Sequence, residues 1–243
     1  PKTKRLARND YPKLPPIIYN KIKIVSPKPL RTVYNKLKKD STLAFEEGLT
    51  ASAFNDASKQ NKLRQLAQGA LYIDLEKKDP RRGGPNHPYE IIHKLKAEAL
   101  KELVEGLNGN PVLVPIQFRF DYNIICDVFR DRLHVIRGGT SDKKSQRLIK
   151  KWNSGGIRVL LCNPQSIGHG LNLQRGGHNI IWYALSWNLD HFHQLNGRLD
   201  RTGQKHGVVV SVLLLDVGIE ERVFGVLRNK NSTQRDLLDA VKD

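Results

Sequence analysis

Five runs of consecutive apolar residues divide the C-terminal part of the chain, and each is short enough to be a strand buried on both faces. They are residues 111–117, 133–136, 157–162, 179–184 and 208–214. Around them, apolar residues recur at every third or fourth position, as in amphipathic helices. These segments are residues 93–107, 122–130, 142–152, 189–198 and 219–228. Such an alternation is typical of a parallel sheet with crossover helices, so we predict a doubly wound α/β fold.

The N-terminal third of the chain follows a different pattern. Residues 1–16 are basic and interrupted by proline, which favours an entry linker. Residues 19–24 alternate between apolar and polar side chains, as a half-buried strand does. Because residues 31–39 and 61–72 have helical spacing, we predict a mainly helical subdomain over residues 17–90.

Two stretches of this subdomain show neither the alternation of a strand nor the spacing of a helix. Residues 41–58 are rich in Ala, Ser and Thr with few large apolar residues, and we expect a mobile loop or insertion there. Residues 74–90 include the run Lys77-Lys78-Asp79-Pro80-Arg81-Arg82-Gly83-Gly84-Pro85, which no regular element tolerates. We place the main boundary there, with the C-terminal domain at residues 91–243.

The charge of the chain narrows the class of partner. Its 243 residues include 41 Lys and Arg against 24 Asp and Glu, a formal net charge of +17. Such an excess favours a nucleic acid over an anionic membrane surface, although lysines that only keep the chain soluble are the alternative. No apolar run reaches the roughly 20 residues that cross a bilayer, and no signal peptide is present. We therefore expect a soluble cytoplasmic protein associated with the nucleoid, or a host-cytoplasmic one if a phage encodes it.

The chain offers little for metal or thiol chemistry. Cys126 and Cys162 fall in a predicted core helix and a predicted core strand, which favours buried free thiols. His191 and His193 alternate on a predicted helix and so do not share a face, and we expect no metal site. The absence of Met and the start at Pro1 indicate an excised fragment.

Candidate ligand-binding residues follow the predicted strands, since ligands of open α/β sheets gather beyond the carboxyl ends of the strands. Gly168 and Gly170 lie in the loop after residues 157–162, where they permit close approach of the backbone to a ligand, although an ordinary tight turn has the same composition. Arg198 and Arg201 are three positions apart, so they share a face if the helix persists. Both could then reach one polyphosphate at the ligand edge of the sheet, or they could form a solvated face.

Five segments, in order over roughly residues 93–230, resemble motifs of the C-terminal RecA-like lobe of the Swi/Snf family of superfamily-two, helicase-like, ATP-dependent DNA translocases. The matching segments are Gln117-Phe118, then Gly138-Gly139-Thr140-Ser141 with Arg147, Gly170-Leu171-Asn172-Leu173 within residues 166–174, Trp187-Asn188, and QLNGRLDRTGQ at residues 194–204. Residues 14–72, with Leu63-Arg64-Gln65-Leu66 near their end, resemble the inter-lobe helical region less specifically. The resemblance implies a RecA-like lobe with a helical N-terminal extension.

The resemblance also assigns roles to residues. It implies that Arg201 is an arginine finger, with Arg198 assisting. It implies nucleotide contacts from Gly168, Gly170, Asn172, Gln194 and Gly197, and nucleic-acid contacts from Gln117, Ser166 and Trp187. The expected nucleic acid is double-stranded DNA.

The chain lacks part of the chemistry that this family performs. No segment reads G-x-x-x-x-G-K-[ST], and no acidic pair for magnesium follows one. The resemblance therefore implies that ATP and Mg²⁺ are bound mainly by an N-terminal RecA-like lobe of the same polypeptide. We expect the chain by itself to be inactive in ATP hydrolysis.

Departures from the family pattern leave alternatives open. Asp200 stands where the sixth motif usually has His or Trp, His169 where the fifth commonly has Glu or Val, and Leu189 where Pro is common. These differences indicate a divergent member of phage or bacterial type. The alternatives are a helicase lobe that acts on RNA or unwinds a duplex, and a non-catalytic nucleic-acid-binding module derived from such a lobe.

Overall fold

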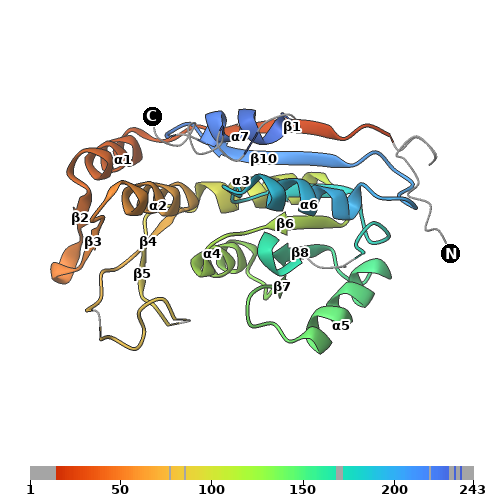
Figure 1. Cartoon of the computed structure of the whole chain (residues 1–243), viewed down its shortest axis with the longest axis horizontal. Helices are drawn as coiled ribbons and strands as arrows, with labels where there is room; N and C mark the ends of the chain where they lie inside the picture. Colours follow the sequence, from red (N-terminus) through yellow and green to blue (C-terminus); the bar gives the residue numbers. More distant parts are fainter. Residues whose placement is uncertain are drawn as a thin grey trace.

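The computed structural model describes residues 15–76, 78–84, 86–167, 172–218 and 220–229, together with residues 233 and 236. Its centre is a six-stranded parallel sheet in the order β1-β10-β9-β6-β8-β7 (Figure 1). The strands are β1 (Ile18–Ile24), β6 (Val112–Pro115), β7 (His134–Ile136), β8 (Val159–Cys162), β9 (Asn179–Trp182) and β10 (Val209–Leu215). Each of the five predicted C-terminal strands is present within two residues of its predicted ends.

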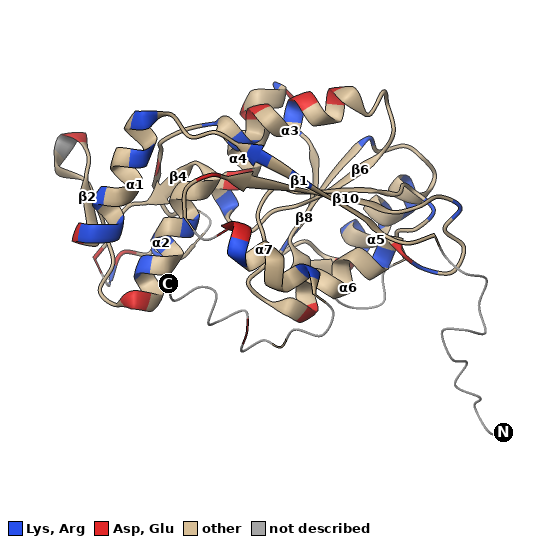
Figure 2. Ribbon diagram, turned by 90° about the horizontal axis from the view of Figure 1, so that it is seen from above, with Lys and Arg blue, Asp and Glu red and all other residues tan. Residues whose placement is uncertain are grey.

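Helices cover both faces of this sheet (Figure 2). On one face lie α3 (Leu95–Gly106) and α4 (Arg119–Phe129), and on the other lie α5 (Asp142–Asn153), α6 (Leu189–Leu199) and α7 (Glu220–Arg228). Successive residues of a strand point to opposite faces, so Leu113 packs in one core while Val112 and Val114 pack in the other. The predicted doubly wound α/β fold is confirmed.

The N-terminal segment contributes one strand to this sheet. Its other helices and short strands form a smaller layer beside the sheet. β1 pairs in parallel with β10 along its whole length, so it lies in the main sheet although the sequence suggested a separate subdomain from residue 17. The other elements are α1 (Lys28–Asp40), β2 (Thr42–Ala44), the 3₁₀ helix η2 (Glu46–Gly48), β3 (Thr50–Ser52), α2 (Asp56–Gln68), β4 (Ala70–Tyr72) and β5 (Tyr89–Ile91). They share a third apolar core, which includes Leu37, Leu66 and Leu71. The division at residue 90 stays a prediction.

Two local predictions in this segment were wrong. Residues 41–58 are not a loop, because β2 and β3 form an antiparallel hairpin and α2 begins at Asp56. The predicted helix over residues 61–72 ends at Gln68 instead. Gly69 stops it in a left-handed conformation (φ +115°), where a side chain would collide with the His93 carbonyl, and β4 then pairs with β5.

The parallel strands give the sheet two distinct edges. The carboxyl edge, where the strands end, faces α1 and α2, while the amino edge, where they begin, lies at the opposite end (Figure 1). Most of the predicted linker at residues 1–16 lies outside the described residues. Cys126 and Cys162 are free thiols, with Cys162 fully buried. In the described part of the chain, no helix is both long and apolar enough to span a membrane.

Candidate nucleotide and nucleic-acid site

The carboxyl edge brings together two of the predicted nucleic-acid residues. Gln117, after β6, and Ser166, in the 3₁₀ helix η3 (Pro164–Ile167) after β8, line the same cleft of about 200 Å³. Arg119 and Arg137 also line it, and no described Asp or Glu does. The arrangement suits a phosphate group flanked by polar side chains.

A buried carboxylate, Asp121, fixes the loop that carries Gln117. Its Oδ2 accepts hydrogen bonds from the backbone N–H groups of Gln117 and Phe118, both at 2.8 Å. The side chain is fully buried, and this burial raises its pKa to about 7, against the lowering effects of those two N–H groups and of the Lys96 and Arg64 charges. Asp121 is therefore a positioning residue for the cleft.

The raised pKa of Asp121 predicts a pH-dependent contribution to stability. Because its pKa is higher in the folded than in the unfolded chain, the free energy of unfolding should fall as pH rises from about 4 to about 7. Asp121→Asn keeps an oxygen for both N–H groups but removes the titration, so it should lose this component. Urea unfolding of both proteins at several pH values measures the difference. Equal pH dependence in both would contradict the assignment.

Trp187, the third predicted nucleic-acid residue, lies apart from this cleft. The Arg64 guanidinium from α2 lies over its ring, 4.3 Å from the centroid, and also 5.7 Å from the Phe118 ring centroid. Asn188 begins α6 as its N-cap, where its side chain accepts a hydrogen bond from the His191 N–H at 2.9 Å. In the Trp187-Asn188 pair, Trp187 therefore contacts Arg64 while Asn188 caps the start of α6.

The predicted nucleotide residues Asn172 and Arg201 meet at the other end of the molecule. An Arg201 Nη1 group donates to Asn172 Oδ1 at 2.6 Å. Asn172 is itself held to the end of α5, since the Asn153 amide donates to its carbonyl at 2.8 Å. Burial, and then the positive charge of Arg201, lower the pKa of Arg198.

The predicted placement of both arginines at the carboxyl edge was wrong. The α6 helix starts at the carboxyl edge and has 11 residues, so at about 1.5 Å per residue it carries its end to the amino edge. It also stops at Leu199, so Arg201 lies in the following turn and not on the helix face that Arg198 occupies.

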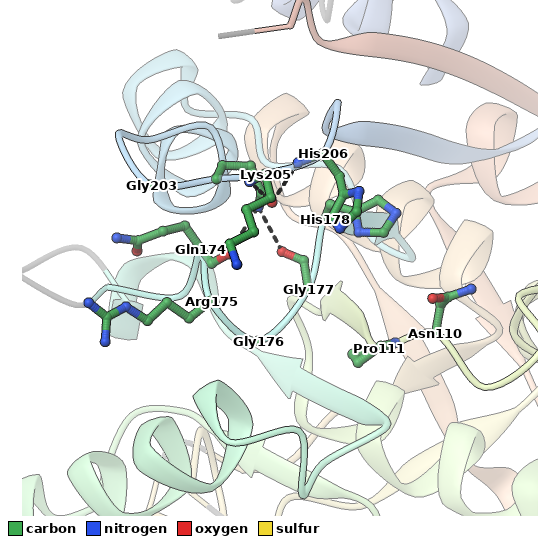
Figure 3. A pocket seen from close by; sticks show the side chains of 11 residues that line it. Asn110, Pro111, Gln174, Arg175, Gly176, Gly177, His178, Gly203, Lys205 and His206 are labelled. Carbon is green, nitrogen blue, oxygen red and sulfur yellow. Dashed lines mark hydrogen bonds between the residues drawn. The ribbon is translucent and has the colours of Figure 1, made fainter. Parts of the chain in front are cut away.

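Gln204 holds that turn against the chain before β9. Its Nε2 donates to the carbonyls of Gln174 at 3.1 Å, Gly177 at 3.0 Å and Leu199 at 3.3 Å. A cleft of about 650 Å³ lies between these turns, lined by residues 174–178 and 203–206 with Asn110 and Pro111 (Figure 3). One wall of this cleft packs closely on α5, since a side chain on Gly176 would collide with Trp152.

Two residues of the fifth motif lie at opposite edges of the sheet. Ser166 lies at the carboxyl edge and Asn172 at the amino edge, and η3, which contains Ser166, packs against α6. Gly168 and Gly170, predicted to contact nucleotide, lie outside the described residues. Of the other two predicted nucleotide residues, Gln194 is exposed on α6 and Gly197 has open space beside it.

The chemistry of the amino-edge group fits a polyphosphate. Two guanidinium groups and the Asn172 amide present hydrogen-bond donors, and the contact between Arg201 and Asn172 leaves the Arg201 charge unneutralised. Repulsion between neighbouring guanidinium groups is relieved when an anion binds between them.

Three residues with a structural part in the site were not singled out from the sequence as site residues: Arg64, Asp121 and Gln204. Asp121 had a local signal, an acidic residue in the first turn of a helix where it can accept from preceding N–H groups. Arg64 lies in the Leu63-Arg64-Gln65-Leu66 segment of the resemblance, but nothing local indicated its role, because its ring partners lie 54 and 123 positions away in sequence.

The sequence of the chain is similar to a protein-family model and to a phage protein. Residues 95–203 match the family model of the helicase conserved C-terminal domain. The chain is 29% identical over 230 residues to putative protein p41 of Acyrthosiphon pisum secondary endosymbiont phage 1, covering 93% of this chain and 46% of that protein.

Two solved structures share the fold. The C-terminal part of the Fun30 ATPase domain has a TM-score of 0.62 and 16% identity, covering 94% of this chain and 96% of that one. The Sulfolobus solfataricus SWI2/SNF2 ATPase core in complex with dsDNA has a TM-score of 0.59 and 18% identity, covering 93% of this chain and 47% of that one. These likenesses confirm the predicted fold of a RecA-like lobe, and the chain spans less than half of p41.

Proposed function

We propose that this chain, which carries a helicase conserved C-terminal domain, is the second motor lobe of an ATP-dependent DNA translocase of Swi/Snf type. The observation that carries the proposal is the contact between Arg201 of the sixth motif and Asn172 of the fifth motif. A P-loop lobe of the same polypeptide would complete the ATP site.

In this proposal the amino edge closes on the nucleotide. Bound ATP with Mg²⁺ supplies the phosphoryl group and the metal charge. Arg201, held ready by Asn172, donates to the oxygens on which negative charge develops, while Arg198 adds a second positive charge. Because no P-loop is present in the sequence, this chain would complete an active site without forming one alone.

The nucleic-acid contacts would come from the carboxyl edge and from the outer surface of α5. Gln117 and Ser166 share the arginine-lined cleft at that edge. On α5, Lys143, Lys144, Arg147 and Lys151 line a groove of about 470 Å³ with His134. The net charge of +17 supports phosphate contacts from this surface, and the proposal places the protein in the cytoplasm with the nucleoid or with host DNA.

Salt dependence of DNA binding tests this surface. Affinity for duplex DNA should fall steeply with salt, because each neutralised phosphate contributes about −0.9 to the slope of log K against log salt. Arg147→Ala should make this slope less negative by about 1, whereas Lys36→Ala, at an exposed position of α1, should leave it unchanged. Fluorescence anisotropy at several salt concentrations gives both slopes. A wild-type affinity that does not change with salt would contradict the proposal.

Stimulation of ATP hydrolysis separates the alternatives. In a polypeptide that carries both lobes, duplex DNA should stimulate turnover more than single-stranded DNA or RNA. Stronger stimulation by RNA would favour an RNA helicase. DNA binding with no hydrolysis under any condition would favour a non-catalytic module.

A further inference from the structure

Arg64 is the single described residue of the N-terminal helical segment whose charged group stacks on two loops at the carboxyl edge. It projects from α2, and its guanidinium carbon lies 4.3 Å from the ring centroid of Trp187 and 5.7 Å from that of Phe118. One ring follows β9 and the other follows β6. A single side chain of α2 therefore contacts two loops, which links three segments that are far apart in sequence.

Arg64 is a partly buried residue, so its charge is only partly exposed to water. Burial lowers the pKa of Arg64 to about 10, and the more distant carboxylates of Glu220 and Asp121 oppose this effect. Both carboxylates already have other partners, since Glu220 pairs with Lys96 and Asp121 accepts from the backbone of Gln117 and Phe118. The faces of the two aromatic rings thus supply close stabilisation of the Arg64 cation.

One of the two rings belongs to a predicted nucleic-acid residue, Trp187, and the other, Phe118, is the direct neighbour of another, Gln117. Phe118 follows Gln117 in the chain, and Asp121 binds the N–H groups of both. Trp187 precedes Asn188, which begins α6, the helix that ends beside Arg201. A shift of Arg64 would therefore move the cleft loop and the start of α6 together.

We propose that Arg64 is a positioning residue that ties α2 to the loops of Gln117 and Trp187, so that movement of the N-terminal helical segment changes the nucleic-acid surface. The consequence for nucleic acid rests on the proposed function, whereas the positioning of Trp187 does not. A planar guanidinium is needed, because an ammonium group cannot stack over both rings.

Tryptophan fluorescence measures this role directly in the chain itself. Of the three tryptophans, Trp152 and Trp182 are fully buried, so an added quencher such as acrylamide reaches mainly Trp187. Arg64→Leu should raise the acrylamide quenching constant clearly above the wild-type value, with Arg64→Lys between the two. Trp187→Phe removes the quenchable component and confirms the source of the signal.

Binding of a short DNA duplex is measured on the same proteins. Loss of the two ring contacts should weaken binding by Arg64→Leu about tenfold. Arg132→Leu removes one exposed positive charge elsewhere and should change neither quenching nor binding beyond a small charge effect. Circular dichroism shows whether each variant is folded. If Arg64→Leu does not fold, Arg64→Lys replaces it in both measurements.

The outcomes separate the inference from the proposed function. Quenching in folded Arg64→Leu or Arg64→Lys that equals the wild type would overturn the positioning role, whatever the DNA result. Raised quenching in a protein whose wild type binds no DNA would leave the positioning role intact and overturn the proposed function. Raised quenching with unchanged DNA affinity would overturn the link between α2 and the nucleic-acid surface.

Discussion

Replacement of Arg201 by alanine, in a polypeptide that also carries a P-loop lobe, is expected to lower ATP turnover by about 10³–10⁵-fold. The reason is that Arg201 would donate to charge that develops only during phosphoryl transfer. Affinity for ATP should change little, since the P-loop lobe would hold most of the nucleotide. Steady-state kcat and an independent measurement of ATP binding separate these two effects.

A neighbouring arginine provides the matched control for this result. Arg175 is exposed at the same amino edge, in the turn before β9. Arg175→Ala removes the same charge from the same end of the molecule and should leave turnover nearly unchanged. An Arg201→Ala protein that retains most of its turnover would exclude the arginine-finger role.

The second large effect concerns stability and the buried ion pair between α3 and α7. Lys96 Nζ donates to Glu220 Oε1 at 2.6 Å, and both side chains are buried. Gln68 of α2 also donates to this oxygen at 3.1 Å, and the Leu215 N–H donates to Glu220 Oε2 at 2.9 Å. Glu220→Ala would leave an uncompensated buried ammonium group, so it should lower the free energy of unfolding by about 3–5 kcal/mol.

Two variants show whether this loss comes from the buried charge. Glu221, the next residue on α7, pairs with Lys21 and Lys23 at the surface, and Glu221→Ala should leave the unfolding transition almost unchanged. The double variant Lys96→Met with Glu220→Gln removes both charges and keeps an acceptor for Leu215, so it should recover most of the lost stability. Urea unfolding gives the free energy of unfolding of the wild type, the two single variants and the double variant. Equal losses in the single and double variants would mean that packing, not charge, explains the effect.

The five C-terminal strands of the sheet could be predicted because they form continuous apolar runs, whereas the place of β1 beside β10 could not, since β1 alternates between apolar and polar residues. The short hairpin of β2 and β3 could not, since three-residue strands give too few alternations to detect. Gly69 marks the end of α2 in the sequence, but the apolar spacing continues past it and so predicted a helix that was too long. Local periodicity therefore predicted the long elements and missed the short ones.

The candidate site was predicted in its residues but not in its arrangement. Arg201 and Asn172 do come together, yet at the amino edge, because the 11 residues of α6 carry the chain from the carboxyl edge to the amino edge. The ion pair of Lys96 had a partial signal, since Lys96, Leu100 and Val104 recur every four residues on one buried face. Its partner Glu220 lies 124 positions away, and only the fold brings the two together.

The central claim is that Arg201 acts on the phosphoryl group across a cleft between two lobes. Its most direct test is retention of ADP in the presence of aluminium fluoride, which mimics the phosphoryl group during transfer, by the two-lobed polypeptide. The wild type should retain ADP for long periods, while Arg201→Ala should release it rapidly although it binds ADP alone equally well. Equal retention by both proteins would contradict the account.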